Sequence, residues 1–412
     1  MPPLDRPKLR PLSGRRLDHD GRSFVALEDP LGLFAQPMLV PWDAWIRVVQ
    51  HFDGTRTLAA IQALALRETG HFIDLADLES LTEQLDQALV LDGPTFQAFR
   101  RDYAESRVRP PAFAGRSYAS TQRSLQAQLL QCFAGEGGAG EPTVGDVDGR
   151  LRGILSPHID FRRGGRAYSW AYRALAERSD ADTFVILGVA HQACARRFVL
   201  TRKDFDTPLG LVETDRDYVD RIAEFAGPTY FDDELAHRME HSVEFQAVFL
   251  KYVLGDRPFR IVPILVGSFY DLMIRRAEPI EDAEVRQFIE ALKQAEREAP
   301  GKVVYIAGID LCHVGPEFGD PDPVSAELLG TIRSFDEGML GHATGCDAAG
   351  WFGHATKVQD RWRVCGLAAT YTMLQAMGPA EGLVLNYQQA VDEGRTCCVS
   401  FASVSYQTTE AP

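Results

Sequence analysis

The chain has 412 residues, of which 45% are hydrophobic and 25% are charged, and its net charge at pH 7 is −15. This length favours two domains of an ordinary globular protein, and the acidic balance argues against a nucleic-acid partner or an anionic membrane surface. No apolar run approaches the ~20 residues of a membrane span, so no membrane association is expected. Seven cysteines are spread unevenly. That spread is not a secreted disulfide framework and predicts a cytoplasmic protein.

The first part of the chain, from about residue 20 to 105, has the pattern of a small separate domain. The Pro- and Arg-rich segment before it, up to Arg22, is expected to be a disordered tail. A short strand at 24–27 is followed by a helical pattern at 42–52, which ends at an Asp-Gly turn. Two leucine-rich stripes at helical spacing follow, one from Thr57 and one from Leu75 to Leu89. Three helices with short flanking strands indicate a winged-helix plan.

This domain resembles the PqqD-like winged-helix family in the segment Asp53-Gly54-Thr55-Arg56-Thr57-Leu58 and in the closing leucine stripe. The resemblance implies binding of a peptide along a strand edge. The alternative is a helical cap with no ligand of its own. DNA binding is disfavoured because the second helix offers only Arg67 as a base-reading cation.

The segment from Arg107 to Pro111 is expected to be a linker between the domains. From Leu151 onward, apolar runs typical of buried strands alternate with helical patterns. The runs at 151–155, 184–189, 261–266 and 303–307 are the clearest of these strands. Such alternation predicts an α/β fold with a largely parallel central sheet flanked by helices.

Polar residues follow three of the predicted strands. His158 and His191 come just after two of them, and the segment Asp310-Leu311-Cys312-His313 follows a third. Side chains just past the ends of parallel strands converge on one crevice, so a metal site is predicted there. A Cys312 thiolate would favour copper(I), iron or zinc, whereas Asp310 or His313 would give an ordinary nitrogen and oxygen site. The residues alone do not choose between these donors.

A further candidate is the helical segment that begins Glu240-His241-Ser242-Val243-Glu244. At spacings of three and four, Glu240, His241 and Glu244 share one face of a helix. A carboxylate beside His241 would orient it and raise its pKa, which suits proton transfer or the holding of an anion. The alternative is a polar cluster with a purely structural role.

The region from residue 109 to 407 resembles the Memo family, which includes bacterial proteins called AmmeMemoRadiSam system protein B. The matching segments are Pro110 to Gly115, Ser156-Pro157-His158, Gly188 to His191, Glu240 to Glu244, Ile261 to Gly267, Asp310-x-Cys312-His313-x-Gly315, and Cys365-Gly366. The resemblance implies a fold similar to class III extradiol dioxygenases, which use non-haem iron. It also implies the metal ligands His158, His191 and Cys312, with His241 as the acid/base histidine. Ile159-Asp160-Phe161 departs from the family pattern and brings a new carboxylate to the site.

The leading hypothesis is a mononuclear iron or copper protein, with zinc as a third possibility, that performs redox or dioxygenase-like chemistry on an unknown small-molecule substrate. Glu240 and Asp310 join His241 as catalytic candidates, and Asp160, Glu244 and His313 would support the ligands. The N-terminal domain would recruit a peptide or a radical-enzyme partner. One alternative is a non-catalytic adaptor that binds a peptide or phosphopeptide in the same crevice. Another is zinc-dependent hydrolysis, with Asp160, Glu240 or Asp310 activating water.

Overall fold

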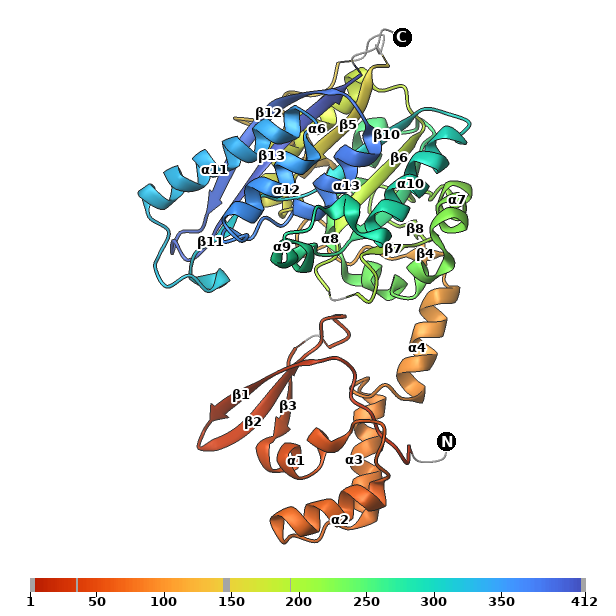
Figure 1. The fold of residues 1–412 in the computed structure, drawn as a ribbon, viewed down its shortest axis with the longest axis vertical. Coiled ribbons are helices and arrows are strands. Elements are labelled where there is room, and N and C mark those ends of the chain that lie inside the picture. The colour runs from red at the N-terminus through yellow and green to blue at the C-terminus, as the bar shows by residue number, and fades with distance from the viewer. Residues whose placement is uncertain (1–3, 35, 144–148, 193, 409–412) are drawn as a thin grey trace. The chain divides into compact units, whose positions relative to one another are not determined.

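The computed structural model describes residues 4–34, 36–143, 149–192 and 194–408. The chain divides into two units, Met1–Ser106 and Arg107–Pro412 (Figure 1). Among the residues that the structure describes, no helix combines the length and apolar content that a membrane crossing needs.

The first unit contains an antiparallel sheet of three strands and four helices. The strands are β1 (Ser13–His19), β2 (Arg22–Glu28) and β3 (Met38–Pro41), in that order in the sheet. The helices are α1 (Trp42–Arg47), α2 (Leu58–Thr69), α3 (Leu75–Gln87) and α4 (Pro94–Glu105), with a 3-10 turn at Val49–His51. Helix α2 begins where expected because the Thr57 hydroxyl accepts a hydrogen bond from the Ala60 amide at 3.2 Å. Val25, Val40, Ile61 and Leu85 lie in the core between sheet and helices.

The expectation of a disordered tail before residue 22 was wrong. Leu9 pairs with Leu91 in an antiparallel bridge, and strand β1 occupies much of the segment. Arg10 forms an ion pair with Asp29 at 2.8 Å, and both side chains are almost fully buried. A buried arginine is tolerated when a carboxylate compensates its charge. Arg10, one of the arginines that suggested a solvated tail, is therefore part of the interior.

The second unit is built on a mixed sheet of eight strands. Its order is β11-β13-β5-β10-β6-β9-β7, and β12 pairs with β13. The bounds are β5 (Leu151–Ser156), β6 (Thr183–Val189), β7 (Phe198–Leu200), β9 (Arg260–Val266), β10 (Val303–Gly308), β11 (His313–Val314), β12 (Glu381–Val391) and β13 (Cys398–Gln407). Strands β5, β10, β6 and β9 are parallel, as the strand and helix alternation predicts. Strands β11, β12, β13 and β7 pair antiparallel with their neighbours, so the sheet is mixed and the expectation of a largely parallel sheet was wrong.

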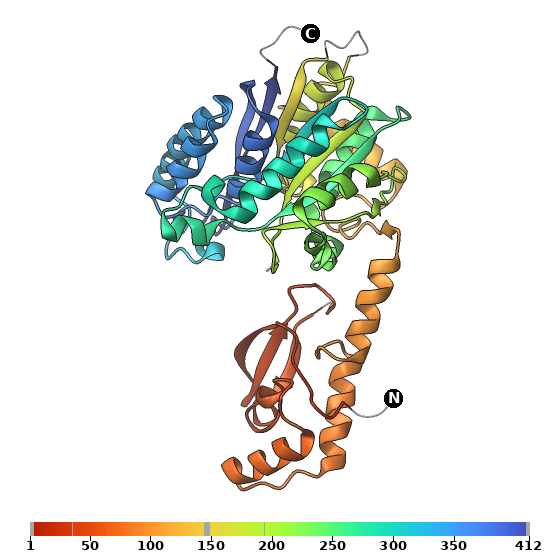
Figure 2. The ribbon, with the colours of Figure 1, turned by 45° about the vertical axis from the view of Figure 1, so that its right-hand side comes forward.

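Helices cover both faces of this sheet. Because side chains alternate along a strand, Val185 and Leu187 of β6 enter one core while Phe184 and Ile186 enter the other. The first core includes residues of α7 (Arg216–Ala226), α9 (Tyr270–Arg275), α10 (Ala283–Arg297), α11 (Ala326–Thr344), α12 (Ala348–Lys357) and α13 (Leu367–Met377). The second includes residues of α5 (Gln122–Ala134), α6 (Phe161–Arg178) and α8 (His241–Leu254). In Figure 2, helix α10 is seen in front of the strands. Short 3-10 turns lie at Pro228–Phe231, Glu234–Met239, Pro279–Glu281 and Pro316–Phe318.

The segment predicted as a linker is folded into the second unit instead. Strand β4 (Val108–Arg109) pairs in parallel with β8 (Asp204–Phe205). Arg109 is fully buried and forms an ion pair with the equally buried Glu244 at 2.6 Å. Its guanidinium also donates hydrogen bonds to the backbone carbonyls of His237 and Glu240. The Pro-rich composition therefore marked an extended strand rather than a free connection.

Candidate metal centre

A cavity of about 680 Å³ lies past the ends of the parallel strands. Strand β5 ends at Ser156, β6 at Val189 and β10 at Gly308, and each is followed by residues that line the cavity. His158 follows β5, His191 follows β6 and Asp310 follows β10. This is the position at which open α/β sheets commonly bind their ligands.

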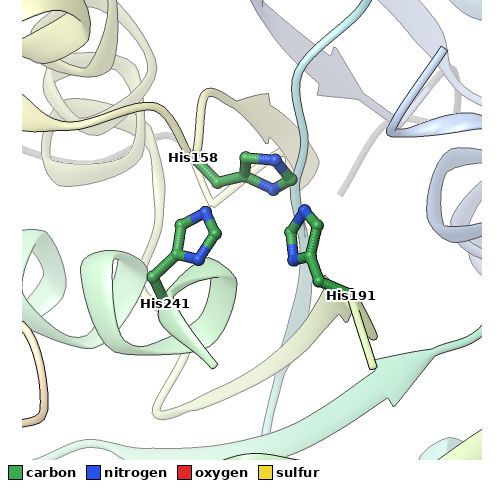
Figure 3. Close-up of side chains that lie close together, drawn as sticks. All are labelled: His158, His191 and His241. Atoms are coloured by element: carbon green, nitrogen blue, oxygen red, sulfur yellow. The ribbon is translucent and has the colours of Figure 1, made fainter. Parts of the chain in front are cut away.

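Three imidazoles meet in this cavity (Figure 3). One ring nitrogen from each of His158, His191 and His241 can be chosen so that all three atoms lie within 4.8 Å of one another. The ring centroids are separated by 5.1 Å for His158 and His191, 5.0 Å for His158 and His241, and 4.8 Å for His191 and His241. Two of the rings come from strand ends and the third from the first residue of helix α8. The side chains thus form a group that could hold a metal ion.

The thiol of Cys365 lies against two of these histidines. Its Sγ lies 3.3 Å from His158 Nε2 and 3.3 Å from His191 Nε2. The Cys365 amide donates a hydrogen bond to Leu311 O at 3.1 Å, which fixes this segment against the chain that follows β10. Cys365 entered the sequence analysis only as part of a family motif. It follows a turn and not a strand, so the rule that donors follow strand ends does not point to it.

The two histidines that face this thiol are held through their other ring nitrogen. His158 Nδ1 lies 2.9 Å from Gly308 O, and His191 Nδ1 lies 2.9 Å from Glu240 Oε2. If each Nδ1 carries the hydrogen, as these acceptors require, each Nε2 keeps its lone pair for the centre of the cluster. A carbonyl or carboxylate that orients a histidine in this way is typical of metal sites.

The charges around the cluster favour a cation at its centre. Burial lowers the pKa of His158 well below its ordinary value. Burial likewise lowers the pKa of His241 to about 4 although Glu240 opposes it, so the expected rise in the pKa of His241 was wrong. Burial alone would also lower the pKa of His191, but the adjacent Cys365 and Glu240 outweigh it and raise that pKa. Burial acts to raise the pKa of Glu240, yet His191 and His241 lower it below its ordinary value. His158 and His241 are therefore neutral beside an ionised Glu240, whereas His191 favours its protonated form, and a metal ion that bound there would displace the proton of His191.

The placement of Cys312 beside the histidines was wrong. Its Sγ is fully buried on the other side of its segment and donates a hydrogen bond to Asp336 Oδ1 at 3.1 Å. Its amide donates to Ser400 Oγ at 2.9 Å. Burial and the neighbouring Asp336 carboxyl both raise the pKa of the Cys312 thiol, so it stays protonated. The motif brings a thiol near the site in sequence, but the backbone turns that thiol into the core.

The other predicted residues divide between the cavity and its support. Asp310 Oδ1 accepts the amide of His158 at 3.0 Å, and burial raises the pKa of Asp310 to about 7. His313 lines the cavity, with Nδ1 at 3.1 Å from Leu311 O. Asp160 also lines it and caps helix α6. Glu240 is the extended N-cap residue before helix α8, so the helical spacing that was expected to place it on one face with Glu244 does not apply. Glu244 is not among the residues that line the cavity and accepts hydrogen bonds from the amides of residues 112 and 113 and from the Tyr118 hydroxyl.

The fold and this cluster define an α/β protein in which His158, His191 and His241 could hold a metal ion. The family model described as Memo-like protein matches residues 109–408. A MEMO1 family protein of Aquifex aeolicus is 28% identical over 94% of this chain and 96% of its own length. A MEMO1 family protein of Methanopyrus kandleri is 30% identical over 69% of this chain and 93% of its own length. The chain belongs to the Memo family.

Proposed function

We propose that this protein binds one transition-metal ion at His158, His191 and Cys365 and uses it for redox chemistry on a small molecule in the adjoining cavity. The observation that carries the proposal is the approach of the Cys365 thiol to within 3.3 Å of the Nε2 atoms of both histidines. Each histidine is already oriented by an acceptor on its Nδ1 atom. The approach of two imidazole Nε2 atoms to one thiol is what a shared metal ion would require of these three side chains.

The donor chemistry fits iron or copper best. Two imidazoles and a thiolate are borderline to soft ligands, which disfavours magnesium and calcium and leaves zinc as a third candidate. A bound iron or copper ion would supply one-electron chemistry and a Lewis-acid centre to the cavity. The cavity volume of about 680 Å³ is within the range of small-molecule sites. Dioxygenase-like chemistry, which the family resemblance implies, is the reaction class that we propose.

The chain's own residues would position the substrate and move its protons. His241 is neutral near pH 7, because burial lowers its pKa to about 4, so its free ring nitrogen can accept a proton. Phe113 packs edge-on against the His241 ring at a centroid distance of 5.4 Å and limits the water around it. Asp310 has its pKa raised to about 7 by burial and is the second group able to carry a proton there.

The first test of the proposal is metal content. The full chain, purified without a chelating tag, is expected to hold one iron or copper per molecule by elemental analysis. His158→Ala and His191→Ala should each abolish this binding. His191→Ala should change the melting temperature little because its side chain is 39% exposed, whereas His158→Ala should also lower it because that side chain is buried and bonded to Gly308 O. Unchanged metal content in both variants would contradict the proposal. A metal-free wild-type protein that binds acidic or phosphorylated peptides would favour the adaptor function instead.

The second test separates proton transfer from metal binding at His241. His241→Gln keeps a hydrogen-bonding side chain of similar size but removes the titrating group. We expect this variant to keep its metal and to lose oxygen consumption with catechol-like probes. Loss of the metal in this variant would place His241 among the ligands. Retention of both metal and activity would contradict an acid/base role.

The first unit supports a second proposal, recruitment of a peptide partner. Among the described strands of that unit, β1 and β3 each pair only with β2, so each has one edge without a strand partner. An extended peptide, including a segment of a radical-enzyme partner, could add to such an edge. Selection from a random peptide library on the full chain, followed by hydrogen exchange, should show amide protection in β1 or β3. Protection confined to the second unit would contradict this proposal.

A further inference from the structure

Two arginines, Arg163 and Arg363, line the cavity beside the histidine and cysteine cluster. Their guanidinium groups donate hydrogen bonds to different partners. Arg363 donates from Nη1 to His313 O at 2.9 Å and from Nη2 to Asp320. Arg163 donates from Nε to Asp160 Oδ2 at 2.5 Å. Within the described part of the chain, Asp160 is the one carboxylate in ion-pair contact with Arg163. The Arg163 side chain also makes a hydrogen bond with the Cys397 side chain. It is 41% exposed, and a guanidinium has five N–H donors, so donors remain for a ligand.

Asp160 orients Arg163 without using up its hydrogen-bonding capacity. Its Oδ1 accepts the amides of Arg162 and Arg163 at 3.1 and 3.2 Å, and its Oδ2 accepts Arg163 Nε. Both oxygens are therefore committed to the first turn of helix α6 and hold the guanidinium at its Nε side. The outer pair of N–H groups on a guanidinium matches the two oxygens of a carboxylate.

The positive charge of Arg163 shifts the pKa of groups that line the cavity. Against burial, which raises the pKa of the Cys397 thiol, Arg163 lowers that pKa through its charge and through its hydrogen bond to Cys397. Arg163 also adds to burial in lowering the pKa of His313. Cys397 and His313 both line the cavity, so Arg163 acts on the space in which a substrate would lie.

The remainder of the wall is largely apolar and aromatic. Phe113 and Phe245 line the cavity and pack edge-to-face at a centroid distance of 5.8 Å, beside His241. Phe269 and Met273 add further apolar surface. A flat apolar body suits such walls, and pockets of this kind use a few polar groups to fix orientation.

We propose that Arg163 determines substrate specificity by binding the carboxylate of an apolar, planar small molecule whose body lies against Phe113 and Phe245. The inference rests on the proposed function, because it assumes that this cavity is the substrate site. A carboxylate is favoured over a phosphate dianion because Asp160, adjacent to the guanidinium, would repel a second negative charge. Arg163 thus binds the end of the substrate away from the reacting atoms.

Calorimetric titration with benzoate, and with benzamide as its neutral counterpart, tests this proposal. The wild-type protein should prefer benzoate by about tenfold, the factor expected of one charge-assisted pair at a partly exposed site. Arg163→Gln should abolish that preference, and Arg163→Lys should retain part of it because the charge remains without the planar fork. Arg162→Gln is the matched control: it neutralises the adjacent, exposed arginine, which does not line the cavity, and should leave the preference unchanged.

Metal content and melting temperature are measured on the same samples. Equal binding of benzoate and benzamide, or no benzoate binding by wild-type protein, would overturn the proposal. So would a benzoate preference that persists in Arg163→Gln, because the carboxylate would then bind elsewhere, for example at the metal. If wild-type protein holds no metal, the redox function fails. An Arg163-dependent preference in that metal-free protein would still support the carboxylate subsite.

Discussion

Cys312 and Cys365 lie on neighbouring segments of the second unit, yet only one thiol reaches the histidines. The two segments are joined by hydrogen bonds from the Cys365 amide to Leu311 O and from the Gly366 amide to Asp310 O. Cys365 Sγ contacts two imidazole nitrogens, whereas Cys312 Sγ contacts the buried Asp336 carboxyl. A donor near a site in sequence is therefore a candidate ligand only when the local backbone directs its side chain there.

The two thiols also differ in how their neighbours shift their pKa values. Burial raises the pKa of both. At Cys365 the neighbouring His191 opposes burial and lowers the pKa, whereas at Cys312 the Asp336 carboxyl raises it further. Metal ligation requires a thiolate, so the cost of deprotonation is smaller at Cys365.

The largest expected effect is the loss of metal in Cys365→Ser. Removal of a thiolate ligand should weaken metal affinity by more than about 100-fold, beyond the loss typical of residues that only support a ligand. The measurement is metal stoichiometry after dialysis, with Cys312→Ser as the matched control that should keep its metal. The reverse pattern, with metal retained in Cys365→Ser and lost in Cys312→Ser, would restore the ligand set expected from the motif.

A substitution beside Cys365 should disturb the same centre through the backbone. A Cβ on Gly366 would lie 2.5 Å from Ile309 Cβ and 2.9 Å from Asp310 O. Gly366→Ala is therefore expected to lower the free energy of unfolding by about 1–3 kcal/mol and to reduce metal affinity as the segment shifts. Chemical denaturation and metal titration check both effects. Gly353→Ala, where a Cβ meets open space within helix α12, should be neutral or stabilising.

Truncation of the other thiol should affect stability alone. Cys312→Ala removes a buried sulfur and its hydrogen bond to Asp336. We expect a loss of about 1–2 kcal/mol in the free energy of unfolding, with unchanged metal stoichiometry. A drop in metal content at constant stability would show that the two segments are more closely coupled than their side-chain contacts indicate.

The smallest expected effect is a pH dependence that originates at Asp336. Burial raises the pKa of this carboxyl from 3.8 to about 6 in the folded protein, although Ser400, Cys312 and Tyr387 oppose the shift. The folded state therefore binds more protons than the unfolded state between these values, and the contribution of Asp336 to stability improves as pH falls through 6. Between about pH 7 and about pH 5, wild-type protein should gain about 1 kcal/mol relative to Asp336→Asn. Equal pH dependence of the two proteins in denaturant titrations would show that Asp336 does not hold its proton there.

The parts of this protein that the sequence predicts are those governed by short-range periodicity. Apolar runs locate the four parallel strands, and their ends bring His158 and His191 to one cavity, where His241 joins them. Cys365 follows a turn in which the non-glycine residues Gln359, Asp360 and Arg363 adopt left-handed backbone angles. No residue pattern announces such a conformation, because the surrounding contacts impose it.

Long-range pairing accounts for the two segments that were predicted wrongly outside the site. The bridge between Leu9 and Leu91 and the pairing of Val108 with Asp204 each join residues far apart in the chain. The composition of each segment, rich in proline and arginine, is shared by solvated tails and by short edge strands. Only the partner distinguishes them, and a single sequence does not identify that partner.

The buried pair of Arg109 and Glu244 also limits how this chain can be recombined. Arg109 comes shortly after Ser106, where the first unit ends, and its guanidinium compensates a carboxylate on the helix that begins with His241. Removing one member of a fully buried pair typically costs about 3–5 kcal/mol. A gene fusion that exchanged the first unit for another module would therefore have to make its junction before Arg107. A crossover a few codons later would remove Arg109, leave Glu244 uncompensated and destabilise the second unit.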